Sequence, residues 1–191
     1  GPHPTIVKTR VIAHHQQVVR VDREEPSPLP PTAVSRLIRA VEERLDDVDA
    51  VIIEDYGKGT ITRALLSVVI PSARRKKKII TVDPKEEHFE LYQGVTALTP
   101  NRFEAGEMVG YELKREEDIR RAGHDLLQRL RCDAALITLG EDGMWLFEQA
   151  PHRAGAGQGV RQVRIPTVAQ EVFDVAGAGD TVIASFTLAL A

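Results

Sequence analysis

Short, almost purely apolar runs alternate along this chain with segments in which apolar residues recur at helical spacing. The apolar runs lie at residues 49–55, 79–82, 96–99 and 134–138. Apolar side chains three or four residues apart predict helices from Val34 to Leu45, from Ile61 to Val69 and from Ile119 to Leu130. Strands that lack polar alternation are buried on both faces, as in a parallel sheet covered by helices. The chain is therefore expected to have an α/β core built on a mostly parallel central sheet.

The N-terminal residues have a different pattern. Two β-branched runs, TIVKTRVI from Thr5 and QVVRVD up to Asp22, flank a polar HHQ and predict an antiparallel ribbon. The proline-rich PSPLPP ends this pattern, which divides the chain into a small β segment, residues 1–24, and an α/β core, residues 25–191. Exposed strand edges pair readily with a second copy, so the ribbon is a candidate homodimer interface. Residues 144–175 predict short antiparallel edge strands around a glycine-rich loop.

Charge and composition exclude several classes of partner. A net charge of −3, with 28% charged residues of both signs interspersed, argues against a nucleic-acid surface and favours small-molecule ligands. The single cysteine cannot form an internal disulfide, no apolar run approaches the roughly 20 residues that span a bilayer, and no export signal is evident. A cytoplasmic location without membrane insertion is expected. The adjacent His14 and His15, near His3, would point to opposite faces of a strand and lack the spacing of metal ligands.

Polar residues follow each predicted strand of the core. Ligands of open α/β sheets bind beyond the carboxyl ends of the strands, so these residues are the first candidates for a site. They are Asp55, Lys58, Asp83, Lys85, Asn101 and Glu104, with Thr60 as a candidate helix cap, and a turn that holds Gly140 and Gly143 follows the run at 134–138. Each has a structural alternative, because Asp-Pro and Gly-x-x-Gly fit turns and Asn101 with Glu104 fits a capping box. Their shared place at one sheet edge favours a ligand site.

The segment GAGD, residues 177–180, precedes an apolar run that predicts a helix. Small residues at a helix start let a phosphate approach the free backbone N–H groups, and the positive end of the helix keeps an adjacent Asp180 ionised and able to accept a proton. The pattern predicts phosphoryl transfer to a hydroxyl group. The structural alternative is a tight loop followed by an acid that stabilises the helix dipole. The other glycine cluster, residues 155–159, is followed by neither helix nor acid, and no GxxxxGK[ST] loop occurs.

Several motifs resemble one enzyme family. DVAGAGDTV resembles the signature of the ribokinase-like, or PfkB-type, carbohydrate kinases, TLGEDG resembles their nucleotide-binding turn, and NRFE resembles their NxxE motif. TRVIAHHQQVVRVDRE, EDYGKG, VDPK and LTPNRFE, in this order, resemble the bacterial heptose 7-phosphate kinases of the family, whose kinase domain is often fused to an adenylyltransferase. The resemblance covers nearly the whole chain. It implies a three-layer ribokinase-like fold with a small N-terminal β lid.

The resemblance also implies a role for each candidate residue. Asp180 is implied as the catalytic base, with Gly177, Ala178 and Gly179 as the anion hole for the transferred phosphate. Asn101 and Glu104 would position Mg²⁺ and phosphate, with Glu104 as a metal ligand, and Thr138, Gly140 and Gly143 would line the ATP site. Lys58 and Lys85 are implied as phosphate or substrate contacts.

The reaction that the resemblance implies is ATP-dependent phosphorylation of heptose 7-phosphate to heptose 1,7-bisphosphate, a step in the synthesis of ADP-heptose for lipopolysaccharide. Two alternatives stay open: phosphorylation of another sugar, such as fructose or ribose, and a non-catalytic remnant that binds nucleotide. Family members begin with a strand and a GG segment near the sugar and continue with helices over the adenine, whereas this chain opens at GPHPTIVKTR and ends at Ala191. An internal fragment, truncated at both ends, is therefore expected, and such a fragment can fold without being active by itself.

Overall fold

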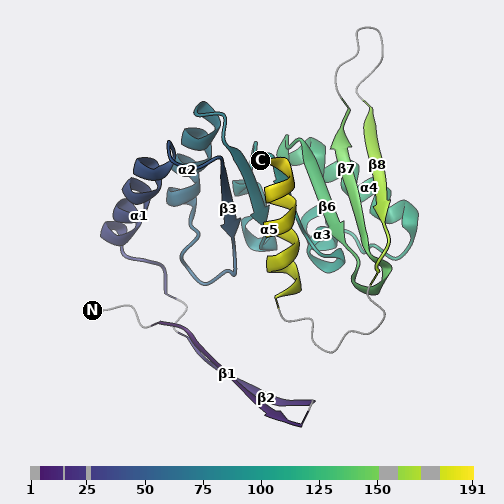
Figure 1. Ribbon diagram of the computed structural model, residues 1–191, viewed down its shortest axis with the longest axis horizontal. Coiled ribbons are helices and arrows are strands. Elements are labelled where there is room, and N and C mark those ends of the chain that lie inside the picture. The colour runs from purple at the N-terminus through teal and green to yellow at the C-terminus, as the bar shows by residue number, and fades with distance from the viewer. Residues whose placement is uncertain (1–4, 15, 25–26, 151–158, 169–176) are drawn as a thin grey trace.

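Two separate sheets organise the computed structural model, which describes residues 5–14, 16–24, 27–150, 159–168 and 177–191 (Figure 1). An antiparallel ribbon is formed by β1 (Val7–Ala13) and β2 (Gln16–Arg23). The strands of the main six-stranded sheet, in spatial order, are β3 (Ala50–Glu54), β4 (Ile79–Asp83), β5 (Ala97–Leu98), β6 (Ala134–Thr138), β7 (Met144–Gln149) and β8 (Val160–Ile165).

The main sheet is parallel from β3 to β6 and antiparallel from β6 to β8. Its parallel strands coincide with the apolar runs of the sequence, although β5 keeps only two residues of the run at 96–99. The antiparallel strands β7 and β8 lie in the segment where edge strands are predicted; residues 151–158 and 169–176 of that segment, with most of its glycine cluster, lie outside the described residues. An α/β fold with a mostly parallel sheet is confirmed.

Helices cover both faces of this sheet. The described α-helices are α1 (Pro31–Arg44), α2 (Arg63–Arg75), α3 (Arg102–Val109), α4 (Glu116–Leu130) and α5 (Ala178–Leu190), and the 3₁₀ segments are η1 (Glu86–Leu91) and η2 (Gly140–Asp142). In Figure 1, α5 lies in front of the sheet, against β3 and β4, whereas α3 and α4 lie behind it. The sheet is thus the middle of three layers. Among the residues described, no helix is both long and apolar enough to cross a membrane.

Strand register decides which side chains face α5. Ile53 and Val82 are registered partners on β3 and β4, and both are buried in the main hydrophobic core on the side away from α5. Side chains alternate between the faces of a sheet, so the next registered pair, Glu54 and Asp83, points to the face that α5 covers. Two acidic side chains therefore lie at the carboxyl ends of neighbouring strands, under the start of α5.

The helix α2 begins later than its apolar pattern predicts. Its N-cap is Thr62, whose Oγ1 accepts a hydrogen bond from the N–H of Leu65 at 3.2 Å, so the assignment of Thr60 as the cap is wrong. The extra loop exists because Gly57 and Gly59 adopt φ values of 64° and 82°, which glycine reaches without strain. This loop joins the end of β3 to the start of α2.

Most valines of the ribbon of β1 and β2 gather on one of its faces. Registered pairing places a set of valines on one face, each between 46% and 58% exposed: Val7, Val11, Val19 and Val21. The opposite face carries Lys8, Arg10 and Asp22. His14 lies in the connecting turn with a φ of 55°, not in a strand, and His3 and His15 are outside the described residues.

Candidate active site

Three carboxylates from three different elements meet at the carboxyl end of the parallel strands. Glu54 ends β3, Asp83 ends β4, and Asp180 lies in the first turn of α5. One oxygen of each lies within 4.8 Å of the others. Asp180 thus faces the sheet edge at which the polar residues were expected to gather.

The position of α5 over this edge is fixed by a buried hydrogen-bond chain. The Oγ1 of Thr187 donates to the carbonyl of Ile183 at 2.7 Å and lies 2.6 Å from the Oγ1 of Thr81 on β4. Since the single proton of Thr187 is used within the helix, Thr81 is the donor of the second bond. Both threonines are buried, and Ile183 is fully buried against the sheet. This anchor sets the distance between the start of α5 and the end of β4.

The first turn of α5 leaves its backbone amides open. Gly177 caps the helix with a φ of 75°, and Ala178 and Gly179 are exposed. The first N–H groups of a helix have no partner within it and carry partial positive charge, so they form a site for an anion. A Cβ built on Gly179 would lie 3.7 Å from Oδ2 of Asp83, which shows how closely this turn approaches the acidic strand end.

Burial and mutual repulsion raise the pKa values of two carboxyl groups in the cluster. Burial, followed by the charges of Asp83 and Asp180, raises the pKa of Glu54 to about 7. Burial also raises the pKa of Asp83, against a hydrogen bond from Thr99 that lowers it. The cluster therefore holds more negative charge than its surroundings stabilise, and either a proton or a cation relieves it.

The donor set fits a hard divalent cation. Carboxylate oxygens are the ligands that Mg²⁺ prefers, and the Oε2 atom of Glu54 is buried without a hydrogen-bond partner among the described residues. Glu54, Asp83 and Asp180 are the residues that could hold such an ion, directly or through water. A cation at this position would also offset the repulsion between these carboxylates and a bound phosphate.

We expect the cluster to make stability depend on pH and on Mg²⁺. Glu54 holds its proton more tightly in the folded than in the unfolded chain, so its contribution to stability is present at low pH and is lost as pH rises through about 7. Millimolar Mg²⁺ should raise the midpoint of thermal unfolding more at pH 8 than at pH 5.5, because the cation replaces the proton. Unfolding scans with Mg²⁺ or EDTA measure this difference. In Glu54→Gln the pH dependence of the Mg²⁺ effect should shrink, and an equal effect at both pH values in the wild type would contradict the assignment.

The NRFE segment and the TLGEDG turn lie side by side. Asn101 and Glu104 form a capping box at the start of α3: Oδ1 of Asn101 accepts from the N–H groups of Phe103 and Glu104, and Oε2 of Glu104 accepts from Asn101 N at 2.8 Å. Asn101 also forms a parallel bridge with Thr138 at the end of β6. The structural alternative for these two residues is therefore realised. Burial raises the pKa of Glu104 against a hydrogen bond from Asn101 N that lowers it, and the charges of Asp83 and Glu86 raise it further.

The turn after β6 is tied to α3 by an ion pair. Arg102 Nη2 lies 2.6 Å from Oδ2 of Asp142 in η2. Gly140 begins η2 and Gly143 follows it, with φ values of 63° and 84°. The structure thus brings Asn101, Thr138, Gly140 and Gly143 to one stretch of the rim, which is the edge of the sheet at which the parallel strands end.

Both candidate lysines are engaged in ion pairs. Nζ of Lys58 lies 2.6 Å from Oε1 of Glu24, and Nζ of Lys85 lies 2.6 Å from Oε1 of Glu86. Lys58 lines a cavity of about 600 Å³ between the ribbon and the end of β3, together with Lys8 and Arg10 from β1. This cavity also includes Glu54 and Tyr56, so it opens onto the carboxylate cluster.

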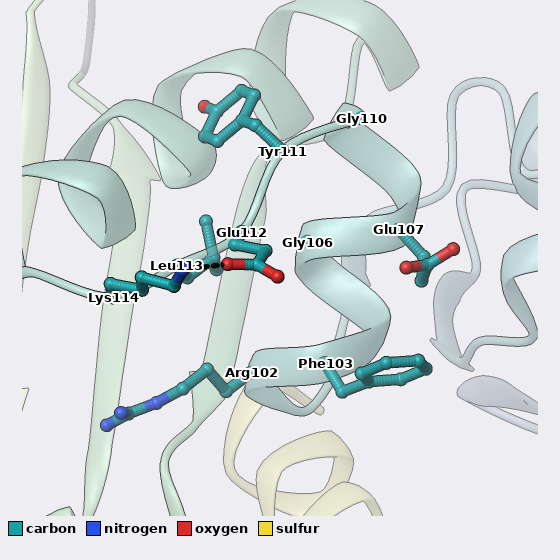
Figure 2. A pocket seen from close by; sticks show the side chains of 9 residues that line it. All are labelled: Arg102, Phe103, Gly106, Glu107, Gly110, Tyr111, Glu112, Leu113 and Lys114. Carbon is teal, nitrogen blue, oxygen red and sulfur yellow. Dashed lines mark ion pairs between the residues drawn. The ribbon is translucent and has the colours of Figure 1, made fainter.

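A second cavity, of about 660 Å³, lies between α3 and the segment Tyr111–Lys114 (Figure 2). Arg102 and Phe103 extend in different directions from the first turn of α3, and Glu112 forms an ion pair with Lys114 across the cavity's edge. Its lining includes none of the three clustered carboxylates. We assign no role to this cavity.

Glu54 and Tyr56 were not expected at the site from the sequence, and Asp55 does not take the place expected for it. Glu54 closes an apolar run, and only the register of β3 and β4 shows that it faces α5. Tyr56 donates a hydrogen bond to Oδ1 of Asp180 at 2.9 Å, and this bond is the first cause of a pKa of about 12 for its phenol. Asp55, expected at the rim, is buried, and its carboxylate bonds to His88 and Tyr92. The alternation of side chains along VIIED was the one signal that could have indicated Glu54.

A three-layer α/β fold in which an aspartate follows a glycine at a helix start and faces acidic strand ends is the arrangement expected of the ribokinase-like class. The chain belongs to the pfkB family of carbohydrate kinases, which it matches over residues 2–191. It is 42% identical over 187 residues to the bifunctional protein HldE of Wolinella succinogenes, covering 98% of this chain and 37% of that protein. It is 44% identical over 191 residues to bifunctional protein HldE of Citrifermentans bemidjiense, covering 100% of this chain and 37% of that protein. The chain thus spans a little over a third of these relatives.

Solved structures of kinases share the fold. Phosphofructokinase-2 from Escherichia coli, in complex with substrates and products, superposes with a TM-score of 0.71 at 17% identity, covering 97% of this chain and 57% of that one. Ribokinase from Arabidopsis thaliana, complexed with ribose and ATP, gives a TM-score of 0.63 at 17% identity, with 92% and 52% covered. At this identity the likeness establishes the ribokinase-like fold, which confirms the expected architecture.

Proposed function

We propose that this protein transfers the γ-phosphoryl group of ATP to a hydroxyl group of heptose 7-phosphate, giving heptose 1,7-bisphosphate and ADP. The observation that carries the proposal is the placement of the Asp180 carboxylate beside the open amides of α5 and over the acidic ends of β3 and β4. The similarity to HldE proteins and the EDYGKG and QQVVRVD segments support the heptose branch. The product would enter the synthesis of ADP-heptose for lipopolysaccharide.

The residues of the cluster fit the demands of this reaction. Asp180 would take the proton of the attacking hydroxyl group. At the same time the hydroxyl oxygen would bond to the γ-phosphorus, and the bond between the γ-phosphorus and the oxygen that bridges to the β-phosphate would break, which releases ADP. The amides of Gly177, Ala178 and Gly179 would bind the transferred group and stabilise its charge. A bound Mg²⁺ would neutralise phosphate charge, and we propose Glu54 and Asp83 for its coordination in addition to Glu104, which the NxxE resemblance implies.

The rim from α3 to η2 is the proposed place of ATP. Asn101 and Glu104 would act at the phosphate end, and Thr138, Gly140 and Gly143 would line the nucleotide. The capping box uses Oδ1 of Asn101 and Oε2 of Glu104, so these two residues would also hold the start of α3 in place. The Arg102–Asp142 ion pair supports the same segment from the outside.

The cavity below the ribbon suits a substrate that already carries a phosphate. Lys8, Arg10 and Lys58 line it, and Lys58 would exchange Glu24 for the phosphate of the sugar. Lys85 would act similarly on the other side of Gly57, where an added Cβ would lie 3.3 Å from the Cγ of Lys85. Several cations in one cavity favour a sugar phosphate over a free sugar such as ribose or fructose.

The test is ATP consumption by the protein at its full natural length, with heptose 7-phosphate, fructose and ribose compared at equal concentrations. We expect turnover with heptose 7-phosphate and formation of a bisphosphate that mass spectrometry identifies. Turnover with a free sugar instead would favour another carbohydrate kinase of the family. Saturable ATP binding without turnover on any sugar would favour a non-catalytic nucleotide-binding protein.

We also propose that residues 1–24 act as a lid and that their ribbon pairs with a second copy in a homodimer. The half-exposed valine face of β1 and β2 supports this, because an apolar strand face of this kind is stabilised by burial. The enzyme would act in the cytoplasm, where ATP and sugar phosphates occur together. A monomeric mass by sedimentation at high protein concentration would argue against the dimer.

A further inference from the structure

The phenol of Tyr56 occupies one oxygen of the proposed catalytic base. Its hydroxyl group donates to Oδ1 of Asp180 at 2.9 Å, across 124 residues of sequence. The other oxygen, Oδ2, faces the start of the helix, since a Cβ built on Gly177 would lie 3.8 Å from it. The two oxygens of Asp180 are thus distinguished: one is held by Tyr56, and the other faces the anion site.

The backbone on either side of Tyr56 is held by a cluster of hydrogen bonds around the buried Asp55. The carboxylate of Asp55, 1% exposed, accepts hydrogen bonds from Gly57 N at 2.8 Å, from Nδ1 of His88 at 2.6 Å and from the hydroxyl of Tyr92 at 2.7 Å. Asp55 N donates to the carbonyl of Asp83 at 3.1 Å. These bonds fix the backbone on both sides of Tyr56 against β4 and η1, so its side chain leaves the loop in a defined direction.

The specific contact that Tyr56 makes with the helix start is the hydrogen bond of its hydroxyl group. Tyr56 is 55% exposed, and Nζ of Lys8 lies 5.7 Å from the centroid of its ring. An exposed ring of this kind adds little to core packing, whereas the Tyr56–Asp180 bond joins the loop after β3 to the helix start.

We propose that Tyr56 is a positioning residue for Asp180: its hydroxyl group holds Oδ1 so that Oδ2 is directed at the attacking hydroxyl of the substrate. This inference rests on the proposed function and assigns a role that the GAGD motif does not contain. Without the phenol proton, Asp180 rotates among several side-chain conformers in the repulsive field of Glu54 and Asp83, and only a fraction of them are productive. The loss should appear in kcat, because substrate binding does not need the bond.

The test compares Tyr56→Phe with Tyr111→Phe in the full-length protein, with ATP and heptose 7-phosphate. Tyr111 donates the same kind of bond, to Oδ2 of Asp125 at 2.8 Å, but lies in the cavity behind α3, so it is the matched control. We expect kcat to fall about tenfold in Tyr56→Phe, with both KM values within about twofold and an unchanged unfolding temperature. Tyr111→Phe should keep the wild-type kcat.

A double-mutant cycle separates positioning from a general structural effect. In the Asp180→Asn background, Tyr56→Phe should cause no further loss of the residual rate, because the group that it positions is already disabled. A wild-type kcat in Tyr56→Phe, a loss confined to KM, or a further tenfold loss on Asp180→Asn would overturn the inference while leaving the proposed kinase activity in place. A wild-type protein that does not phosphorylate heptose 7-phosphate would overturn both together.

Discussion

Asp180→Asn is expected to lower kcat by about 10³-fold, within the range that general-base catalysis contributes. Asparagine keeps the size of the side chain and its Oδ1 can still accept from Tyr56, but it cannot take a proton from the substrate. Steady-state ATP consumption with heptose 7-phosphate measures the loss. The KM for ATP should change little, because the amides of α5 remain in place.

The unfolding temperature of Asp180→Asn shows whether the loss of kcat is a loss of catalysis or a loss of folded protein. Removing one charge from a cluster of three like charges should leave the unfolding temperature of Asp180→Asn equal to or above that of the wild type. The matched control is Asp47→Asn, an exposed aspartate beyond the end of α1, which should change neither activity nor stability. A variant that keeps more than a tenth of the wild-type kcat would remove Asp180 from the role of base.

The parallel strands and most helices could be predicted because their signal is local. Each apolar run became a parallel strand, and the helical patterns became α1, α2 and α4 with shifts of a few residues at their ends. The places of Asp83 and Asn101 at the ends of parallel strands followed from the rule that ligand groups gather there, and the place of Asp180 followed from the GAGD pattern at a helix start.

What could not be predicted depends on contacts between distant segments. Glu54 becomes a site residue because α5, more than a hundred residues later, covers its face of the sheet. Asp55 looked like a rim residue but is taken into the interior by His88 and Tyr92, 33 and 37 residues away. Thr60 lost the role of cap because the positive φ values of Gly57 and Gly59 lengthened the loop. None of these effects arises from a repeating pattern within one segment, so none of them could be predicted from that segment alone.

The two glycines of the GEDG turn have different physical roles, which the sequence motif does not distinguish. Both were expected to line ATP, yet a Cβ at Gly143 would lie 2.2 Å from the carbonyl oxygen of Ile165 and 2.8 Å from Thr167 N. A Cβ at Gly140 would meet no atom of the described residues within 4 Å. Gly143 is therefore required by the approach of β8, whatever binds at the rim, whereas Gly140 is free of such a constraint.

Gly143→Ala is accordingly expected to lower the free energy of unfolding by about 3 kcal/mol or more, since it adds a backbone clash to the strain of a non-glycine residue in this conformation. Its φ of 84° and ψ of −132° lie in a region that essentially only glycine occupies. For a domain of this size the unfolding temperature should fall by roughly 10 °C, which calorimetry can measure.

Gly140→Ala is the matched control, because it has a positive φ of 63° and open space around it, and it should cost only about 1 kcal/mol. If ATP approaches this turn, the methyl group of Gly140→Ala should raise the KM for ATP although the fold is retained. A Gly143→Ala protein as stable as Gly140→Ala would mean that β8 does not pack against the turn as described. If the two variants lose similar stability and Gly140→Ala leaves the KM for ATP unchanged, both glycines have only a structural role in the turn.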